Sequence, residues 1–84
     1  MWFTSDDHKA IGKHLAVVRN KAGLGQVELS KRLRKPQSFV SSYEGGQRRL
    51  DLLEMTKIIE AIGADPKAVI AKLIDIAIRR LRQV

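Results

Sequence analysis

The residues best suited to chemistry in this sequence are uncharged hydrogen-bonding side chains between positions 37 and 42. At the period of an α-helix they share one face: Gln37, Ser38, Ser41 and Ser42. Three apolar residues share the opposite face: Phe39, Val40 and Tyr43. A helix face that meets only water normally carries Lys and Glu, so this composition favours contact with a surface rich in donors and acceptors. The base edges in a DNA groove form such a surface.

The sequence offers little for catalysis or metal binding. His8 and His14 are six residues apart on one predicted helix, too far round it to share a metal ion, and the chain has no cysteine. The serines have no base near them in the sequence, which favours packing or groove contacts over nucleophilic roles. We therefore expect no enzymatic activity, no metal site and no cofactor.

Basic residues are concentrated in the first part of the chain. Residues 1–49 hold ten Lys or Arg against four Asp or Glu, a balance of +6, whereas residues 50–84 hold six against five, a balance of +1. Such clustering attracts polyanions, so double-stranded DNA leads the expected partners. A loop over residues 45–49 adds three side chains that we expect at the DNA backbone: Gln47, Arg48 and Arg49.

Two short helices must position the polar face. Val27, Leu29 and Leu33 lie at helical spacing and predict a helix over residues 26–33. Pro36 interrupts it, and because proline is tolerated in a first turn, a second helix is predicted from Pro36 to Glu44. Gln26 follows Gly25 at the start of the first of these helices, where its side chain and free backbone N–H groups suit a phosphate oxygen.

Three further helices are predicted around this pair. The first covers about residues 6–22, is capped by Thr4 or Ser5, ends at Gly23 and has a buried stripe of Ile11, Leu15, Val18 and Ala22. Another opens at Asp51 in a capping box with Glu54, closes at Gly63 and has a stripe of Leu52, Met55, Ile59 and Ile62. The last starts at Asp65-Pro66 and runs to about Arg82. The chain is therefore expected to be one all-α domain over residues 1–84.

Two parts of this outline imply contacts beyond their own helix. Arg19 lies beside the stripe of the first helix and needs a carboxylate partner, for which we select Glu44. The last helix has an apolar stripe broader than one small domain requires: Val69, Ile70, Leu73, Ile74, Ile76, Ala77, Ile78, Leu81 and Val84. We expect dimerisation through Val69, Leu73, Ile76 and Ala77. The alternative is that Trp2, Phe3 and the first helix cover the excess.

Three segments together resemble the Cro/C1-type (XRE-type) helix-turn-helix family. They are GLGQVELSKRL at 23–33, PQSFVSSYEGG at 36–46 and IIEAIG at 58–63, and the likeness covers about residues 11–66. The resemblance implies a compact five-helix, lambda-repressor-like domain that binds DNA, typically as a dimeric transcriptional repressor. Residues 67–84 then form an extended C-terminal helix.

The resemblance also implies roles for individual residues. Gln26 matches the phosphate-anchoring glutamine, Gln37 the base-reading glutamine, and Arg19 with Glu44 a structural salt bridge. Ser38, Ser41 and Ser42 match other groove-facing positions. Arg34 departs from the pattern, because the family usually has glycine at this turn position, where a left-handed backbone costs another residue about 1 kcal/mol. A phosphate contact from Arg34 or Lys35 is the expected gain.

Two other functions remain possible on this fold. The same domain can serve as a protein-interaction module, such as an antitoxin or adaptor, with the wide last helix as the contact. Association of that helix with a membrane surface is disfavoured, because core and dimer contacts explain its apolar residues. No apolar run is long enough for a bilayer span or a signal peptide, so we expect a cytoplasmic protein.

Overall fold

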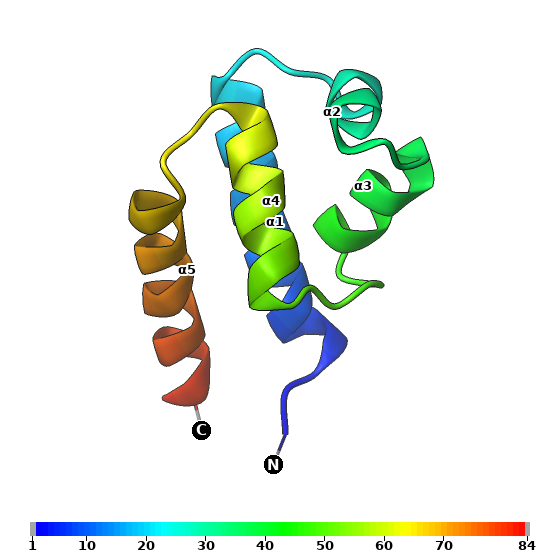
Figure 1. Cartoon of the computed structure of the whole chain (residues 1–84). Coiled ribbons are helices and arrows are strands. Elements are labelled where there is room, and N and C mark those ends of the chain that lie inside the picture. The colour runs from blue at the N-terminus through cyan, green and yellow to red at the C-terminus, as the bar shows by residue number, and fades with distance from the viewer. Residues whose placement is uncertain (1, 84) are drawn as a thin grey trace.

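The computed structural model describes residues 2–83, and these form five α-helices without a strand (Figure 1). In chain order they are α1 (Ser5–Lys21), α2 (Gln26–Leu33), α3 (Gln37–Glu44), α4 (Leu52–Ile62) and α5 (Pro66–Leu81). The predicted all-α, five-helix fold is confirmed. No helix among the described residues has the length and apolar character needed to cross a bilayer.

The helix ends follow local capping signals. Thr4 caps α1 and donates its backbone N–H to Asp7 Oδ2 at 2.7 Å, so the helix begins one residue before the predicted start. In α4, Asp51 Oδ1 accepts the N–H of Glu54 at 2.7 Å and Glu54 Oε1 accepts the N–H of Asp51 at 3.1 Å. Gly63 ends α4 in the left-handed region, with φ of 92°. These signals fix the start of α1 and both ends of α4, which pack against α3 and α2, respectively.

All five helices contribute to one core, and several residues of the predicted stripes lie outside it. The prediction that Leu52 is buried is wrong, since Leu52 is 60% exposed while Ile58 is 1% exposed. Leu52 is the first residue of α4, so the inward face starts one turn later. Ala22 is also exposed, because it caps the end of α1. The core residues are Leu15, Leu24, Leu29, Leu33, Val40, Tyr43, Ile58, Ile59, Ile62 and Leu73.

A glycine brings α1 against the end of α3. Gly12 is buried in the middle of α1, and a β-carbon there would collide with the carbonyl oxygen of Tyr43. The absence of a side chain therefore allows the two helix backbones to approach closely. This contact holds the C-terminal end of α3 against the body of the protein.

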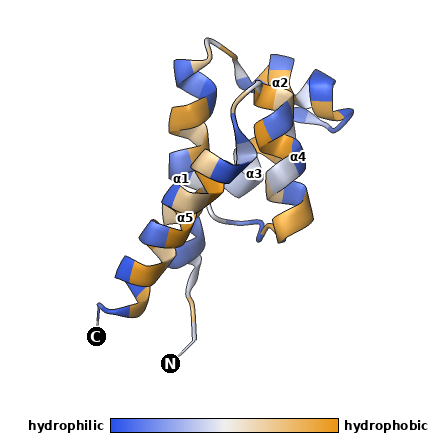
Figure 2. Cartoon of the chain, turned by 60° about the vertical axis from the view of Figure 1, so that its left-hand side comes forward, coloured by the Kyte–Doolittle hydropathy of each residue, from blue (hydrophilic) through white to orange (hydrophobic). Residues whose placement is uncertain are grey.

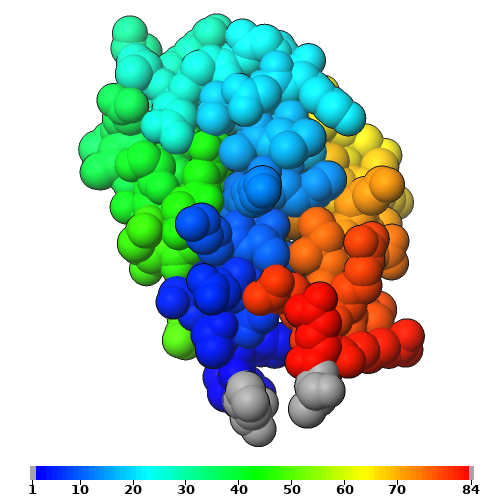
Figure 3. Space-filling model, turned by 180° about the vertical axis from the view of Figure 1, so that it is seen from behind, coloured from blue at the N-terminus to red at the C-terminus, as the bar shows by residue number. Residues whose placement is uncertain are grey.

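The two ends of the described chain meet at one end of the molecule. Arg80 Nε on α5 donates to Asp7 Oδ1 on α1 at 2.8 Å. Figure 3 shows the end of α5 beside the start of α1. Trp2 is 80% exposed, so it does not cover the broad apolar surface of α5, whereas the first helix, which belonged to the same alternative, does pack against α5.

The residues expected to dimerise lie on the side of α5 that faces the core. We call Val69, Leu73, Ile76 and Ala77 the inner stripe. Leu73 is only 3% exposed, and Val69 and Ile76 pack against the core cluster. The assignment of Leu73 to a dimer interface is therefore wrong, because α1 and α4 already cover this side of the helix. Other apolar residues continue along α5 toward its C-terminal end (Figure 2), and three of them are exposed: Ile74, Ile78 and Leu81. Val84 lies outside the described residues.

Candidate nucleic-acid interface

The turn between α2 and α3 fixes the direction of α3. Arg34 adopts a left-handed conformation, with φ of 55° and ψ of 43°, and it is the only residue other than glycine with positive φ among residues 2–83. The N–H of Lys35 then bonds the carbonyl of Ser30 at 3.0 Å and closes α2. Pro36 is extended and precedes the first residue of α3, so the helix begins one residue later than predicted.

The two faces of α3 have opposite environments. Val40 and Tyr43 are fully buried, and the Phe39 ring packs edge-on against Tyr43 with centroids 5.6 Å apart. Burial raises the pKa of Tyr43, so its hydroxyl stays protonated at neutral pH and the residue serves packing. The other face is open to solvent at three positions, Gln37, Ser38 and Ser41, and half-buried at Ser42. The helix therefore presents an uncharged hydrogen-bonding surface.

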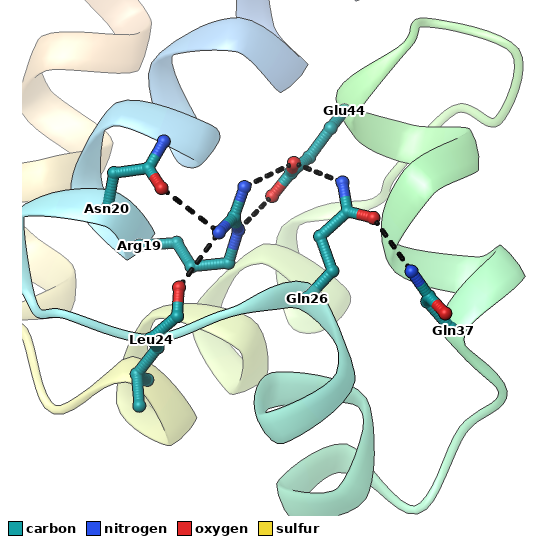
Figure 4. Close-up of polar contacts among 6 residues, drawn as sticks. All are labelled: Arg19, Asn20, Leu24, Gln26, Gln37 and Glu44. Atoms are coloured by element: carbon teal, nitrogen blue, oxygen red, sulfur yellow. Dashed lines mark hydrogen bonds and ion pairs between the residues drawn. The ribbon is translucent and has the colours of Figure 1, made fainter.

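A buried ion pair connects the C-terminal end of α3 to α1. Arg19 Nε lies 2.7 Å from Glu44 Oε2, and Arg19 Nη2 lies 2.9 Å from Glu44 Oε1, with both side chains less than 10% exposed (Figure 4). Arg19 Nη1 also donates to the carbonyl of Leu24 at 2.8 Å and to Asn20 Oδ1 at 3.2 Å. Hydrogen bonding to Glu44 raises the pKa of Arg19, which keeps the guanidinium charged despite its burial. The ion pair ties the end of α3 to α1.

The same carboxylate orients the two glutamines. Gln26 Nε2 donates to Glu44 Oε1 at 2.9 Å, and Gln26 Oε1 accepts a longer hydrogen bond of 3.4 Å from Gln37 Nε2 (Figure 4). Gln26 is half-buried between them, whereas Gln37 is exposed. A continuous chain of hydrogen bonds therefore runs from Arg19 through Glu44 and Gln26 to Gln37. It fixes which end of each amide points outward.

The polar residues of the loop after α3 have two different environments. Arg48 forms an ion pair with Glu54 on α4, and its Cζ lies 4.9 Å from the centre of the Phe39 ring. These partners hold the exposed Arg48 side chain against α3 and α4, although the sequence assigned it only to DNA phosphate. Gln47 and Arg49 are exposed. Lys35 Nζ lies 5.6 Å from the Phe39 ring, so two cations flank this aromatic residue.

The charges around the polar face are mostly positive. Arg34, Lys35 and Arg49 are exposed on the segments that enter and leave α3. Among residues 2–83, no group of three or more His, Cys, Asp or Glu side chains is arranged to hold a metal ion. The arrangement suits a polyanion that meets the serine and glutamine face between flanking cations.

Sequence reasoning missed four contacts of the site. The Gln26–Glu44 and Gln26–Gln37 hydrogen bonds join residues 18 and 11 positions apart, and Arg48 reaches both α3 and α4. No local pattern signals such pairs, because they depend on how α1, α2 and α3 meet. The only signal in the sequence was a glutamine at the first position of each of α2 and α3.

Comparisons with known proteins agree with this geometry. A model of the helix-turn-helix domain family matches residues 10–73. The fold is similar to that of a solved XRE-family like protein from Pseudomonas syringae pv. tomato str. DC3000, with a TM-score of 0.74, 41% identity, and coverage of 83% of this chain and 85% of that one. No curated protein matches the chain significantly in sequence. The suspected resemblance is confirmed, and the chain belongs to the XRE-type helix-turn-helix family.

Proposed function

We propose that this protein binds a specific sequence in double-stranded DNA as a dimer and acts as a transcriptional repressor at a near-palindromic operator. Membership of the XRE-type helix-turn-helix family supports DNA binding and a regulatory, non-enzymatic role. The observation that carries the proposal is the exposed, uncharged face of α3, which a buried hydrogen-bond network supports and cations surround.

Gln37 is the proposed base-reading residue. One N–H of its amide points to Gln26 Oε1, which leaves its carbonyl oxygen and second N–H for DNA. An outward acceptor beside an outward donor matches N6 and N7 of adenine in the major groove. Ser38, Ser41 and Ser42 allow close approach and accept several bases, since a hydroxyl both donates and accepts. Specificity is then concentrated at one base pair of each half-site, with DNA shape adding to it.

Phosphate contacts come from both ends of the polar face. Gln26 anchors one phosphate through the N–H groups of the first turn of α2 and the remaining N–H of its side chain. Arg34 and Lys35 lie on the turn before α3, and Gln47 and Arg49 lie on the loop after it. These contacts supply affinity without sequence preference. Arg48 contributes mainly by holding the loop, because Glu54 and Phe39 already bind its guanidinium.

Dimerisation would allow two copies of α3 to enter successive major grooves about 34 Å apart. Such a complex over a promoter competes with polymerase, which is the simplest route to repression. A regulator of this kind would act in the cytoplasm.

The exposed apolar residues of α5 favour a second candidate, a protein-interaction module such as an antitoxin or adaptor. Ile74, Ile78 and Leu81 offer a surface that a different protein could cover. The two functions differ in salt dependence, because binding through apolar contacts changes little with ionic strength whereas DNA binding falls steeply.

Selection of bound sequences from random DNA tests the proposed function. We expect an enriched motif made of two inverted half-sites, each with adenine at one fixed position. Affinity for the selected site should exceed affinity for random DNA by at least about a thousandfold. Binding that enriches no motif, or that does not weaken with added salt, would contradict the proposal.

A further inference from the structure

An apolar cavity lies where α1, α4, α5 and the loop after α3 meet. Its walls include Ile11 from α1, Met55 from α4 and Leu73 from α5. Two other lining residues, Leu52 and Ile74, are 60% and 52% exposed, so the cavity opens to solvent on their side. A molecule from solution can therefore enter it without unfolding the domain.

The volume of the cavity is large for so small a domain. It measures about 290 Å³, whereas the interior of a folded protein usually has few voids larger than a water molecule. An apolar cavity of about 150 Å³ is enough to take up benzene. The space here is about twice that volume, which is close to the lower end of the range for ligand pockets. It has room for a small organic molecule.

One residue of the wall carries a polar group that lacks a partner. Tyr43 lines the cavity and is 1% exposed. Among residues 2–83, its hydroxyl is the only fully buried side-chain nitrogen or oxygen atom without a hydrogen bond. Burial of such a group costs free energy unless a partner is supplied. Phenylalanine would provide the same ring for packing without this cost, so the hydroxyl indicates a partner that enters the cavity.

The other polar side chains of the wall favour an uncharged partner. Arg48 lines the cavity, but its guanidinium is already bound to Glu54 and to the ring of Phe39. An ionised ligand would lose its hydration among apolar walls and find no free guanidinium there. His8 is half-buried at the α1 side and can supply a further donor or acceptor. The cavity therefore suits a neutral molecule with few polar atoms.

We propose that this cavity is a binding site for a small, neutral, largely apolar molecule, and that the Tyr43 hydroxyl donates a hydrogen bond to an oxygen atom of that molecule. Phenols, alcohols and ketones with an aromatic or short aliphatic body belong to this class. None of the polar residues of α3, Gln37, Ser38, Ser41 and Ser42, lines the cavity. The site is thus separate from the proposed DNA contacts, and the proposal does not rest on the proposed function.

Titration of the full chain with p-cresol, without DNA, tests the site. Nuclear magnetic resonance spectra of the backbone amides report both affinity and location. We expect saturable shifts with a dissociation constant of about 1 mM, largest at residues that line the cavity, such as Ile11 and Leu73. Toluene, which has the same ring and methyl group without the hydroxyl, should shift the same amides. Shifts that do not saturate, or that lie mainly elsewhere, would overturn the proposal.

A variant that fills the cavity tests the location independently. Ala77 lines the cavity on α5, and Ala77→Phe should weaken the binding of both compounds at least about tenfold. Ala68→Phe is the matched control, because Ala68 is exposed on the same helix and lies outside the cavity. Circular dichroism verifies that both variants keep their helices. Unchanged binding in a folded Ala77→Phe, or an equal loss in Ala68→Phe, would contradict the assignment of the cavity.

Tyr43→Phe tests the hydrogen bond. This variant should bind p-cresol about fivefold more weakly, the loss expected for one hydrogen bond, and should bind toluene as the wild type does. Without ligand it should be at least as stable as the wild type, because the hydroxyl has no protein partner to lose. An equal change for both compounds would remove the role of the hydroxyl. A clear loss of stability without ligand would show that the hydroxyl is already satisfied, which also contradicts the proposal.

The outcome is separable from that of the proposed function. A chain that selects a DNA motif and binds neither compound overturns the cavity site alone. A chain that binds p-cresol through Tyr43 and selects no motif leaves this site supported and overturns DNA recognition.

Discussion

Gln26 and Arg19 share one oxygen atom, because Glu44 Oε1 accepts hydrogen bonds of 2.9 Å from both Gln26 Nε2 and Arg19 Nη2. The carboxylate that neutralises the buried guanidinium therefore also sets the orientation of the Gln26 amide. Gln26 in turn holds Gln37, so the structural ion pair and the proposed base-reading residue belong to one network. Changes to Glu44 should consequently affect both stability and DNA recognition.

Glu44→Gln should lower the free energy of unfolding by roughly 3 kcal/mol, because it leaves the Arg19 charge buried without its counter-ion. Urea unfolding followed by circular dichroism measures this difference. Glu28→Gln is the matched control, since the Glu28–Arg32 pair is about half exposed and its loss should cost less than about 0.5 kcal/mol. Equal changes in the free energy of unfolding from the two substitutions would show that the buried ion pair stabilises the fold no more than the exposed one.

Gln37→Ala should reduce affinity for the selected DNA site by roughly 1–3 kcal/mol and remove the preference at one base pair. Gln37 is exposed, so folding should be almost unaffected. Fluorescence anisotropy with the selected site and with its single-base variants gives both quantities. Ser38→Ala serves as a control, with a smaller loss and an unchanged preference. An equal loss on random DNA would contradict the base-reading role.

Arg34→Gly should raise the free energy of unfolding by about 1 kcal/mol, because glycine adopts the left-handed conformation of this turn without steric cost. Arg34→Ala removes the same charge but keeps the β-carbon, so it should give no such gain. The glycine variant should also bind all DNA sequences more weakly if Arg34 contacts a phosphate. Urea unfolding of both variants distinguishes the backbone effect from the charge effect.

The parts of this fold that could be predicted from the sequence are those that local chemistry determines. Asp51, Gly63 and Pro66 act on neighbouring backbone groups, and they place the ends of α4 and the start of α5 where expected. The two faces of α3 follow from the helical period alone. The left-handed turn at Arg34 was expected from the resemblance to the family, and the structure has it.

The parts that could not be predicted depend on contacts between helices. α5 has apolar residues on two sides, so periodicity does not tell which side faces the core. The residues predicted to dimerise lie on the side that the core covers. Leu52 and Ile58 have similar hydrophobicity, and only the packing of α4 against the other helices decides that Ile58 is buried and Leu52 is not. Arg48 looked like a free loop cation, because nothing in the sequence places Glu54 and Phe39 within its reach.

Arg48 and Arg49 should therefore respond differently to substitution. Arg49→Ala should weaken binding to every DNA sequence and reduce the slope of log affinity against log salt concentration by about 0.9, the value for one lost phosphate contact. Arg48→Ala should leave that slope nearly unchanged and lower the free energy of unfolding by at most about 1 kcal/mol, since it removes a partly exposed ion pair and a contact with Phe39. Salt titrations of DNA affinity and urea unfolding provide the two measurements. Matching slope changes in both variants would assign Arg48 to a phosphate after all.

His14 should make stability depend on pH near neutrality. Burial, together with the nearby Lys72 and Lys21, lowers the pKa of His14 below its ordinary value of 6.5. The unfolded chain then takes up a proton from solution before the folded protein does, so the free energy of unfolding should fall as pH decreases from above 6.5 toward the lower pKa of the folded state. His14→Gln removes the titrating group and should flatten this part of the curve. Urea unfolding at a series of pH values compares the two proteins, and an unchanged slope in the variant would exclude His14 as the cause.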